Sequence, residues 1–230
     1  MGMINSKAKY SIFSNTSDIK CNYRFPTISH ARSSVSLFLM LGLDGVGKTD
    51  LFTRLTCDTK QSSKPKSLPQ PTIGYNVETI TLHSHRFCHR RSHKVTLWDC
   101  GGQSSLRSLW PYHFSNTSLL LWLINVHDRS RLDTNLHLLS QILTNRLLYR
   151  VPVLIVVYQT SYGSQDEKIS DNNDNENLLT NLEVAFRFLA TLTTSRASTF
   201  KWQVINVNLN DNSDKDLKKI RQSFQELMEL

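Results

Sequence analysis

The chain has 230 residues, enough for one well-buried domain with appendages and too few for two domains of ordinary size. It carries 27 Lys and Arg against 19 Asp and Glu, and this net charge of +8 favours anionic partners such as nucleotide phosphates, acidic lipids or nucleic acid. Its four cysteines are scattered without a CxxC pair, which indicates a reduced intracellular compartment and argues against a disulfide scaffold. The longest apolar runs are too short to span a bilayer, so the sequence predicts a soluble or peripheral protein.

The apolar pattern predicts a flexible extension followed by one α/β domain. Residues 1–34 are rich in Ser, Asn and Lys without a firm periodicity, which is typical of a flexible N-terminal extension. Over residues 35–230, short apolar runs alternate with helical spacings, the pattern of a mostly parallel sheet with helices on both faces. Strands are expected at 35–41, 75–82, 94–99, 119–126, 153–158 and 202–207, and helices at 48–55, 132–143, 178–190 and 213–227.

Two polar insertions interrupt this pattern. Residues 83–94 contain four His, three Arg and one Lys with no acid, and they predict a strongly basic hairpin tip. A metal site at these histidines is the weaker alternative, because the run lacks a second paired half at zinc-site spacing and the Arg charges repel cations. Residues 164–177 are acidic and Asn-rich and predict a mobile loop.

A glycine-rich segment at residues 42–49 matches the phosphate-binding pattern GxxxxGK[ST], directly after a predicted strand and at the start of a predicted helix. The glycines allow backbone amides to turn toward phosphate oxygens at the positive end of the helix. Lys48 would neutralise the outer phosphates, and the Thr49 hydroxyl would ligate Mg²⁺. The predicted nucleotide-binding residues are Gly42, Leu43, Asp44, Gly45, Val46, Gly47, Lys48 and Thr49.

A second motif, WDCGGQ at residues 98–103, follows another predicted strand. Asp99 is predicted to hold Mg²⁺ through a water, and Gly102 to offer its amide to a terminal phosphate. Gln103 comes one residue later, where its side-chain amide could orient an attacking water. Gln103 is therefore the predicted catalytic residue, with an ordinary surface Gln at a helix start as the alternative.

Three segments, GLDGVGKT at 42–49, PTIGYNVET at 71–79 and WDCGGQSSLRSLWPYHF at 98–114, resemble the ADP-ribosylation-factor and Arf-like small GTPases. The resemblance covers about residues 35–230. It implies a Ras-like P-loop G domain: a six-stranded, mostly parallel sheet with helices on both faces and one antiparallel edge hairpin. It also implies GTP and GDP as ligands with Mg²⁺, and Thr72 as the switch threonine that closes on the metal and the γ-phosphate.

The guanine-recognition motif departs from these relatives. Where they read NKxD, this chain reads Gln159, Thr160, Ser161 and Tyr162, so the carboxylate that accepts two hydrogen bonds from guanine is missing. Gln159 stays as the predicted base-contacting residue. Two functions remain open: a slow GTPase switch in membrane traffic or related signalling, or a degenerate GTPase that acts as a membrane-recruited scaffold.

The resemblance also implies partners and a location. The N-terminus fits the myristoylation pattern MGxxx[ST] at Gly2, and Lys7, Lys9 and Lys20 would add attraction to acidic lipid. An exchange factor, a GTPase-activating protein and effectors are expected, the effectors at an aromatic patch of Tyr75, Trp98 and His113, for which plain packing is the alternative. The expected location is cytoplasmic and peripheral to a membrane such as the Golgi or another endomembrane. No nucleic-acid module accompanies the basic residues, so nucleic acid is not an expected partner.

Overall fold

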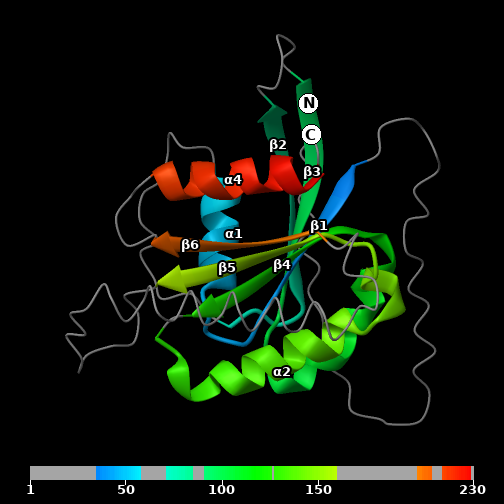
Figure 1. Ribbon diagram of the computed structural model, residues 1–230, viewed down its shortest axis with the longest axis vertical. Helices are drawn as coiled ribbons and strands as arrows, with labels where there is room; N and C mark the ends of the chain where they lie inside the picture. The colour runs from blue at the N-terminus through cyan, green and yellow to red at the C-terminus, as the bar shows by residue number, and fades with distance from the viewer. Residues whose placement is uncertain are drawn as a thin grey trace. The chain divides into compact units, whose positions relative to one another are not determined.

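A six-stranded sheet forms the centre of the domain, and Figure 1 shows helices on both of its faces. The computed structural model describes residues 35–57, 71–84, 91–125, 127–159, 201–208 and 214–228. The strands are β1 (Ser36–Leu41), β2 (Tyr75–Ser84), β3 (Arg91–Cys100), β4 (Thr117–Asn125), β5 (Val153–Gln159) and β6 (Trp202–Asn208). The helices are α1 (Lys48–Thr56), α2 (Leu132–Leu143) and α4 (Asp214–Met228), with 3₁₀ segments η1 (Ser104–Asn116), η2 (Arg129–Arg131) and η3 (Arg146–Leu148).

The strand order is β2-β3-β1-β4-β5-β6. β1 runs parallel to both β3 and β4, and β5 runs parallel to β4 and β6. Only β2 and β3 pair antiparallel, at one edge of this sheet. The predicted fold, a mostly parallel six-stranded sheet with one antiparallel edge hairpin, is therefore confirmed. Because the parallel strands end at the same edge, the loops after β1, β3, β4 and β5 meet there, which is where such sheets bind ligands.

The two faces of the sheet bury separate apolar clusters. On one face α1 and α4 supply the covering side chains, and the rings of Phe38 and Phe224 meet edge to face at 5.0 Å. On the other face α2 and η1 cover the sheet, and Trp110 packs against Trp122 of β4 with ring centroids 5.9 Å apart. Residues of β4 face both clusters, which explains why its central residues, 119–124, form an unbroken apolar run with no alternation.

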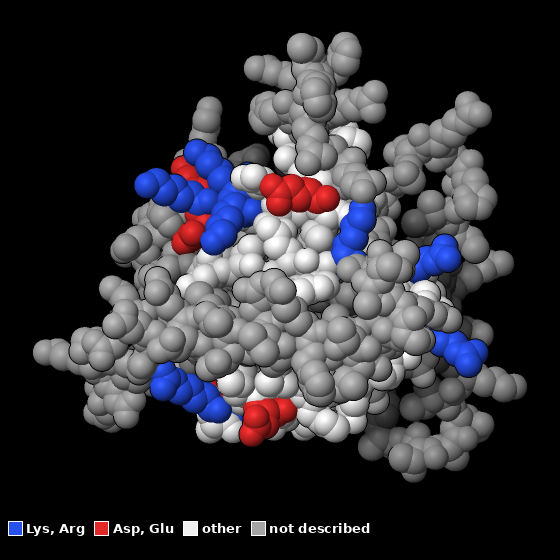
Figure 2. Space-filling model, in the orientation of Figure 1, with Lys and Arg blue, Asp and Glu red and all other residues white. Residues whose placement is uncertain are grey.

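Charge is mixed on the exposed side of α4. Figure 2 shows basic and acidic side chains close together over this helix, whose sequence begins DKDLKK. The net positive charge of the chain is therefore not gathered into a basic patch over α4. Among the described residues, no helix combines the length and the apolar character needed to cross a membrane.

The structure differs from the sequence-based elements in two places. The β2–β3 ladder continues to the pair Ser84–Arg91, so both ends of the predicted hairpin tip at 83–94 belong to strands. The η1 segment was not predicted, and Pro111 inside it lacks the N–H that a continuous α-helix requires. The predicted extension at 1–34, the connection at 85–90, the loop at 164–177 and the helix at 178–190 lie outside the described residues.

Candidate functional site

The loop between β1 and α1 has the backbone shape that its glycines allow. Gly42, Gly45 and Gly47 all have positive φ, and Gly47 caps α1 in the left-handed conformation at φ 92°. A Cβ on Gly42 would lie 2.7 Å from the backbone oxygen of Leu123, so the close approach of β4 also requires glycine at that position. Two of the predicted nucleotide-binding residues, Leu43 and Val46, are apolar and buried in the core. They can therefore serve a phosphate only through their backbone.

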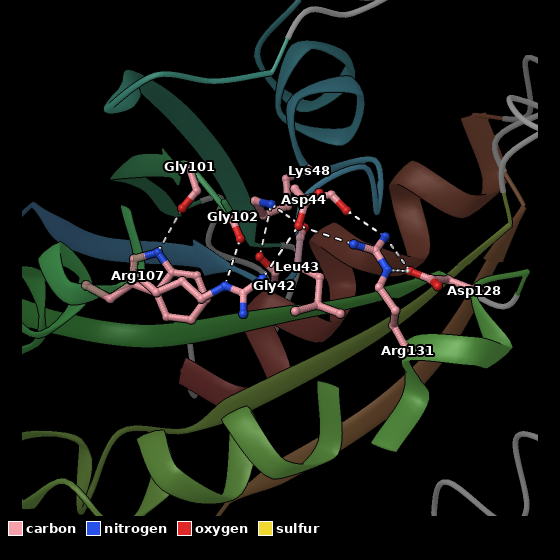
Figure 3. Close-up of polar contacts among 10 residues, drawn as sticks. Gly42, Leu43, Asp44, Lys48, Gly101, Gly102, Arg107, Asp128 and Arg131 are labelled. Carbon is pink, nitrogen blue, oxygen red and sulfur yellow. Dashed lines mark hydrogen bonds and ion pairs between the residues drawn. The ribbon is translucent and has the colours of Figure 1, made fainter. Parts of the chain in front are cut away.

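Lys48 reaches back over this loop. Its buried Nζ donates to the backbone oxygens of Gly42, at 3.1 Å, and Leu43, at 2.7 Å (Figure 3). Burial lowers the pKa of Lys48 to about 8, and the charges of Asp99 and Asp44 oppose that effect. The structure therefore holds an ammonium group on the concave side of the loop, and its neutralisation of phosphates stays a prediction.

The three predicted metal-binding residues meet at one point, although they come from three segments. The Thr49 hydroxyl donates to Oδ2 of Asp99 at 2.8 Å, and the Thr72 hydroxyl donates to the same oxygen at 3.3 Å. The two hydroxyl oxygens lie 2.8 Å apart. Asn76, which the sequence analysis missed, donates to this carboxylate oxygen from β2 at 3.0 Å.

The chemistry of this cluster fits Mg²⁺. Asp99 is fully buried, and its Oδ1 has no hydrogen-bond partner among the described residues. An unpaired carboxylate oxygen is costly to bury, whereas a bound cation or its water would satisfy it. Carboxylate and hydroxyl oxygens are also the ligands that Mg²⁺ accepts in phosphate-binding sites.

The segment after β3 packs directly on the phosphate-binding loop. A Cβ on Gly102 would lie 2.5 Å from the Gly42 oxygen and 2.6 Å from the Asp44 nitrogen, so only glycine permits this approach. The Gly101 amide donates to the Gly74 oxygen at 2.8 Å, which ties this segment to the one that contains Thr72. Gln103 follows as the residue before η1, half-buried, and makes no side-chain capping bond.

Two arginines that the sequence analysis did not select hold these segments. Arg107 of η1 donates to the Gly102 oxygen at 2.9 Å, and its Nη2 lies 3.5 Å from Oδ1 of Asp44. Arg131 of η2 contacts the same carboxylate oxygen from the other side, at 3.2 Å (Figure 3). A basic residue three positions after Asp128 is a weak local signal, and nothing in the sequence links it to Asp44.

The end of β5 contributes a tyrosine that the sequence analysis also missed. The ring of Tyr158 leaves no room for a Cβ on Gly47, which would lie 2.5 Å from a ring carbon. Its hydroxyl donates to Asp50 of α1, and Asp50 accepts a further bond from Arg54 at 3.1 Å. Gln159 is the last residue of β5, but its side chain and residues 160–162 lie outside what the structure describes. The base side of the site therefore stays a prediction.

The predicted aromatic patch is brought together by β2, β3 and η1. Tyr75 stacks on Trp98 with ring centroids 4.8 Å apart, and His113 lies 5.6 Å from the first ring and 5.0 Å from the second. Tyr75 keeps 46% of its surface exposed. The three rings of the aromatic patch therefore pack together, and Tyr75 remains accessible to solvent.

His113 should make the fold sensitive to acid. Partial burial lowers its pKa below the ordinary value of 6.5, so the unfolded chain takes up a proton more readily than the folded one. The stabilising contribution is present above pH 6.5 and is lost as the pH falls below it. We expect the urea midpoint of the wild type to fall more between pH 7.5 and 5.5 than that of His113→Tyr. Equal falls in the two proteins would contradict this.

Most of the chain matches the model of a known protein family. The model of the ADP-ribosylation factor family matches residues 27–210. The E3 ubiquitin-protein ligase arc-1 of Caenorhabditis elegans is 32% identical over 122 residues, which are 53% of this chain and 21% of that protein. ADP-ribosylation factor-like protein 3 of Saccharomyces cerevisiae is 33% identical over 118 residues, covering 51% of this chain and 56% of the yeast protein.

A second yeast protein and one solved structure agree with these matches. ADP-ribosylation factor-like protein 1 of Saccharomyces cerevisiae is 35% identical over 106 residues, 45% of this chain and 50% of that protein. The chain thus spans about half the length of the two yeast relatives and about a fifth of the worm protein. The Arl6 BBS3 small GTPase of Trypanosoma brucei with bound GppNp has a similar fold, with a TM-score of 0.54, 19% identity, and coverage of 84% of this chain and 98% of that one.

Proposed function

Because this chain belongs to the ADP-ribosylation factor family, we propose that it is an Arf-like GTP-binding switch that hydrolyses GTP slowly. Family membership implies guanine-nucleotide binding. The observation that carries the proposal is the convergence of Thr49, Thr72 and Asp99 beside the glycine loop and Lys48. The glycine loop, the Lys48 ammonium and the oxygen cluster together are the groups that bind the phosphates and the metal of a magnesium nucleoside triphosphate.

Each group has a defined task in this proposal. The loop amides and the Lys48 ammonium bind the phosphates, and Thr49, Thr72 and Asp99 would hold Mg²⁺. When bound, the metal neutralises charge on the phosphate oxygens. Gln103 would orient the attacking water, because it directly follows Gly102, which lies against the loop. Positioning and electrostatics are the main contributions a protein can make to this reaction.

Release of the γ-phosphate would act on two segments at once. Thr72 and Gly102 are the predicted contacts to that phosphate, and the bond from Gly101 to Gly74 joins their segments. The aromatic patch of Tyr75, Trp98 and His113 stands on these same parts of the chain. Effectors, exchange factors and GTPase-activating proteins that contact this patch would therefore sense which nucleotide is bound.

A degenerate GTPase that serves as a scaffold is the alternative function. Its support is the replacement of NKxD by Gln159, Thr160, Ser161 and Tyr162. Loss of one charged partner of a buried ligand group weakens discrimination considerably. In this alternative the phosphate side remains intact while the choice of base is lost.

Competition between nucleotides decides between the two functions. We expect GTP to displace labelled GDP at concentrations at least about tenfold lower than ATP does, in millimolar Mg²⁺. The same protein should release phosphate from GTP at a rate on the order of 10⁻⁴ s⁻¹ in the absence of partners. Tyr162→Asp, which restores the missing carboxylate, is the matched variant and should raise the preference for GTP. Equal displacement by ATP and GTP would favour the scaffold.

Membrane recruitment belongs to the same proposal. Acylation of Gly2 would supply one hydrophobic anchor, and Lys7, Lys9 and Lys20 would supply an electrostatic one. All four lie outside the described residues. The combination would place the protein in the cytoplasm at the surface of an endomembrane.

A further inference from the structure

Asp44 places a carboxylate in a loop that binds phosphates. It is the third residue of the glycine loop, and its side chain is 45% exposed. A negative charge at this point repels the phosphate oxygens that the surrounding amides attract. The structure must therefore offset that charge before the loop can bind a triphosphate tightly.

Asp44 lies in the part of the loop that packs against Gly102. Its backbone nitrogen would lie 2.6 Å from a Cβ on Gly102, the glycine proposed to sense the γ-phosphate. A terminal phosphate that Gly102 senses would therefore lie close to Asp44.

Two arginines from different elements offset this charge; we call Asp44, Arg107 and Arg131 the Asp44 clasp. Both guanidinium groups contact Oδ1 of Asp44, at 3.5 Å from Arg107 and 3.2 Å from Arg131 (Figure 3). Arg131 also donates to the Asp44 backbone oxygen at 3.1 Å. Asp128 fixes the guanidinium of Arg131 through contacts to Nε at 2.8 Å and Nη2 at 2.6 Å.

We propose that Arg107 and Arg131 neutralise Asp44 beside the terminal phosphate and thereby set the preference of this site for nucleoside triphosphates over diphosphates. The proposal rests on the phosphate binding of the proposed function. Arg131 acts through Asp44 and is a positioning residue, since its hydrogen bonds go to Asp44 and Asp128. A γ-phosphate adds charge next to Asp44, so removal of Arg131 penalises a triphosphate more than a diphosphate.

Three variants of the full chain test this clasp by calorimetry with GTP and GDP in Mg²⁺. Arg131→Gln should weaken GTP binding about fivefold to tenfold and GDP binding about twofold, since the pair is partly exposed. Asp44→Asn should bind GTP as tightly as the wild type or more tightly. The double variant should return to within about threefold of the wild type, because no carboxylate is left to neutralise.

A purely structural role for Arg131 gives the opposite pattern. If the arginine only holds the loop in shape, the double variant will bind as poorly as Arg131→Gln, and GTP and GDP will weaken equally. Either result overturns the proposal. Weaker GTP binding by Asp44→Asn than by the wild type also overturns it, and this measurement can be made even if the Arg131 variants do not fold. Thermal unfolding of each protein without nucleotide identifies any general loss of stability.

Binding measurements with ATP and ADP distinguish failure of this proposal from failure of the proposed guanine preference. If the wild type binds adenine nucleotides and not guanine nucleotides, the proposed GTP switch fails, and the ATP-to-ADP ratio in the same variants still tests the clasp. If GTP binds selectively but the double variant is not rescued, only the clasp proposal fails. Binding of neither pair overturns both.

Discussion

Lys48→Met should lose at least about 100-fold in nucleotide affinity, equivalent to about 2.8 kcal/mol, and should be no less stable than the wild type. The loss follows from removal of the only ammonium that the described residues place on the concave side of the loop, where it bonds two backbone oxygens. Stability is retained because burial disfavours the charged form of Lys48, as its pKa of about 8 indicates. Methionine fills similar space without a charge to desolvate.

Titration with labelled GDP and urea unfolding without nucleotide measure the two effects separately. Lys94→Met is the matched control, because it removes the same charge from an exposed position on β3. We expect this control to bind nucleotide like the wild type. Equal affinity of both variants would show that phosphates bind elsewhere, and a destabilised Lys48→Met would show that the lysine supports the fold.

The sequence predicted those parts of the site whose chemistry is local. The glycine loop is recognisable because turn, cation and hydroxyl lie within eight consecutive residues, 42–49, between a strand and a helix. Asp99 was recognisable because it lies near the end of a predicted strand and precedes, after Cys100, two consecutive glycines. Periodicity likewise predicted α2 and the buried strands β4 and β5.

The missed residues act through contacts that no short pattern encodes. Arg131 meets Asp44 across 87 positions, and Tyr158 meets Asp50 across 108. In the sequence, both Arg131 and Arg107 look like ordinary surface cations. Trp110 shows the same limit within η1, a segment that was not predicted: its indole nitrogen donates to the Gly101 oxygen at 2.9 Å and anchors the glycines after β3 to η1.

Gly102→Ala should separate the segment after β3 from the glycine loop. The added methyl group would lie 2.5 Å from the Gly42 oxygen, 2.5 Å from the Leu43 carbonyl carbon and 2.6 Å from the Asp44 nitrogen. All three are backbone atoms, so no side-chain rotation relieves the overlap. We expect the free energy of unfolding to fall by about 1–3 kcal/mol, the usual cost of overpacking, as measured by urea denaturation.

Gly74→Ala is the control, because it adds backbone strain without steric overlap with the glycine loop. Gly74 has φ 89°, but a Cβ there meets nothing within 4 Å, so only the conformational cost of about 1–2 kcal/mol applies. The two variants should therefore lose comparable stability and differ in ligand response. Gly102→Ala should reduce the ratio of GTP to GDP affinity, because the displaced amide would no longer reach the terminal phosphate that Gly102 is proposed to sense. If Gly102→Ala retains the wild-type ratio while Gly74→Ala loses it, the glycine that senses the γ-phosphate is not Gly102.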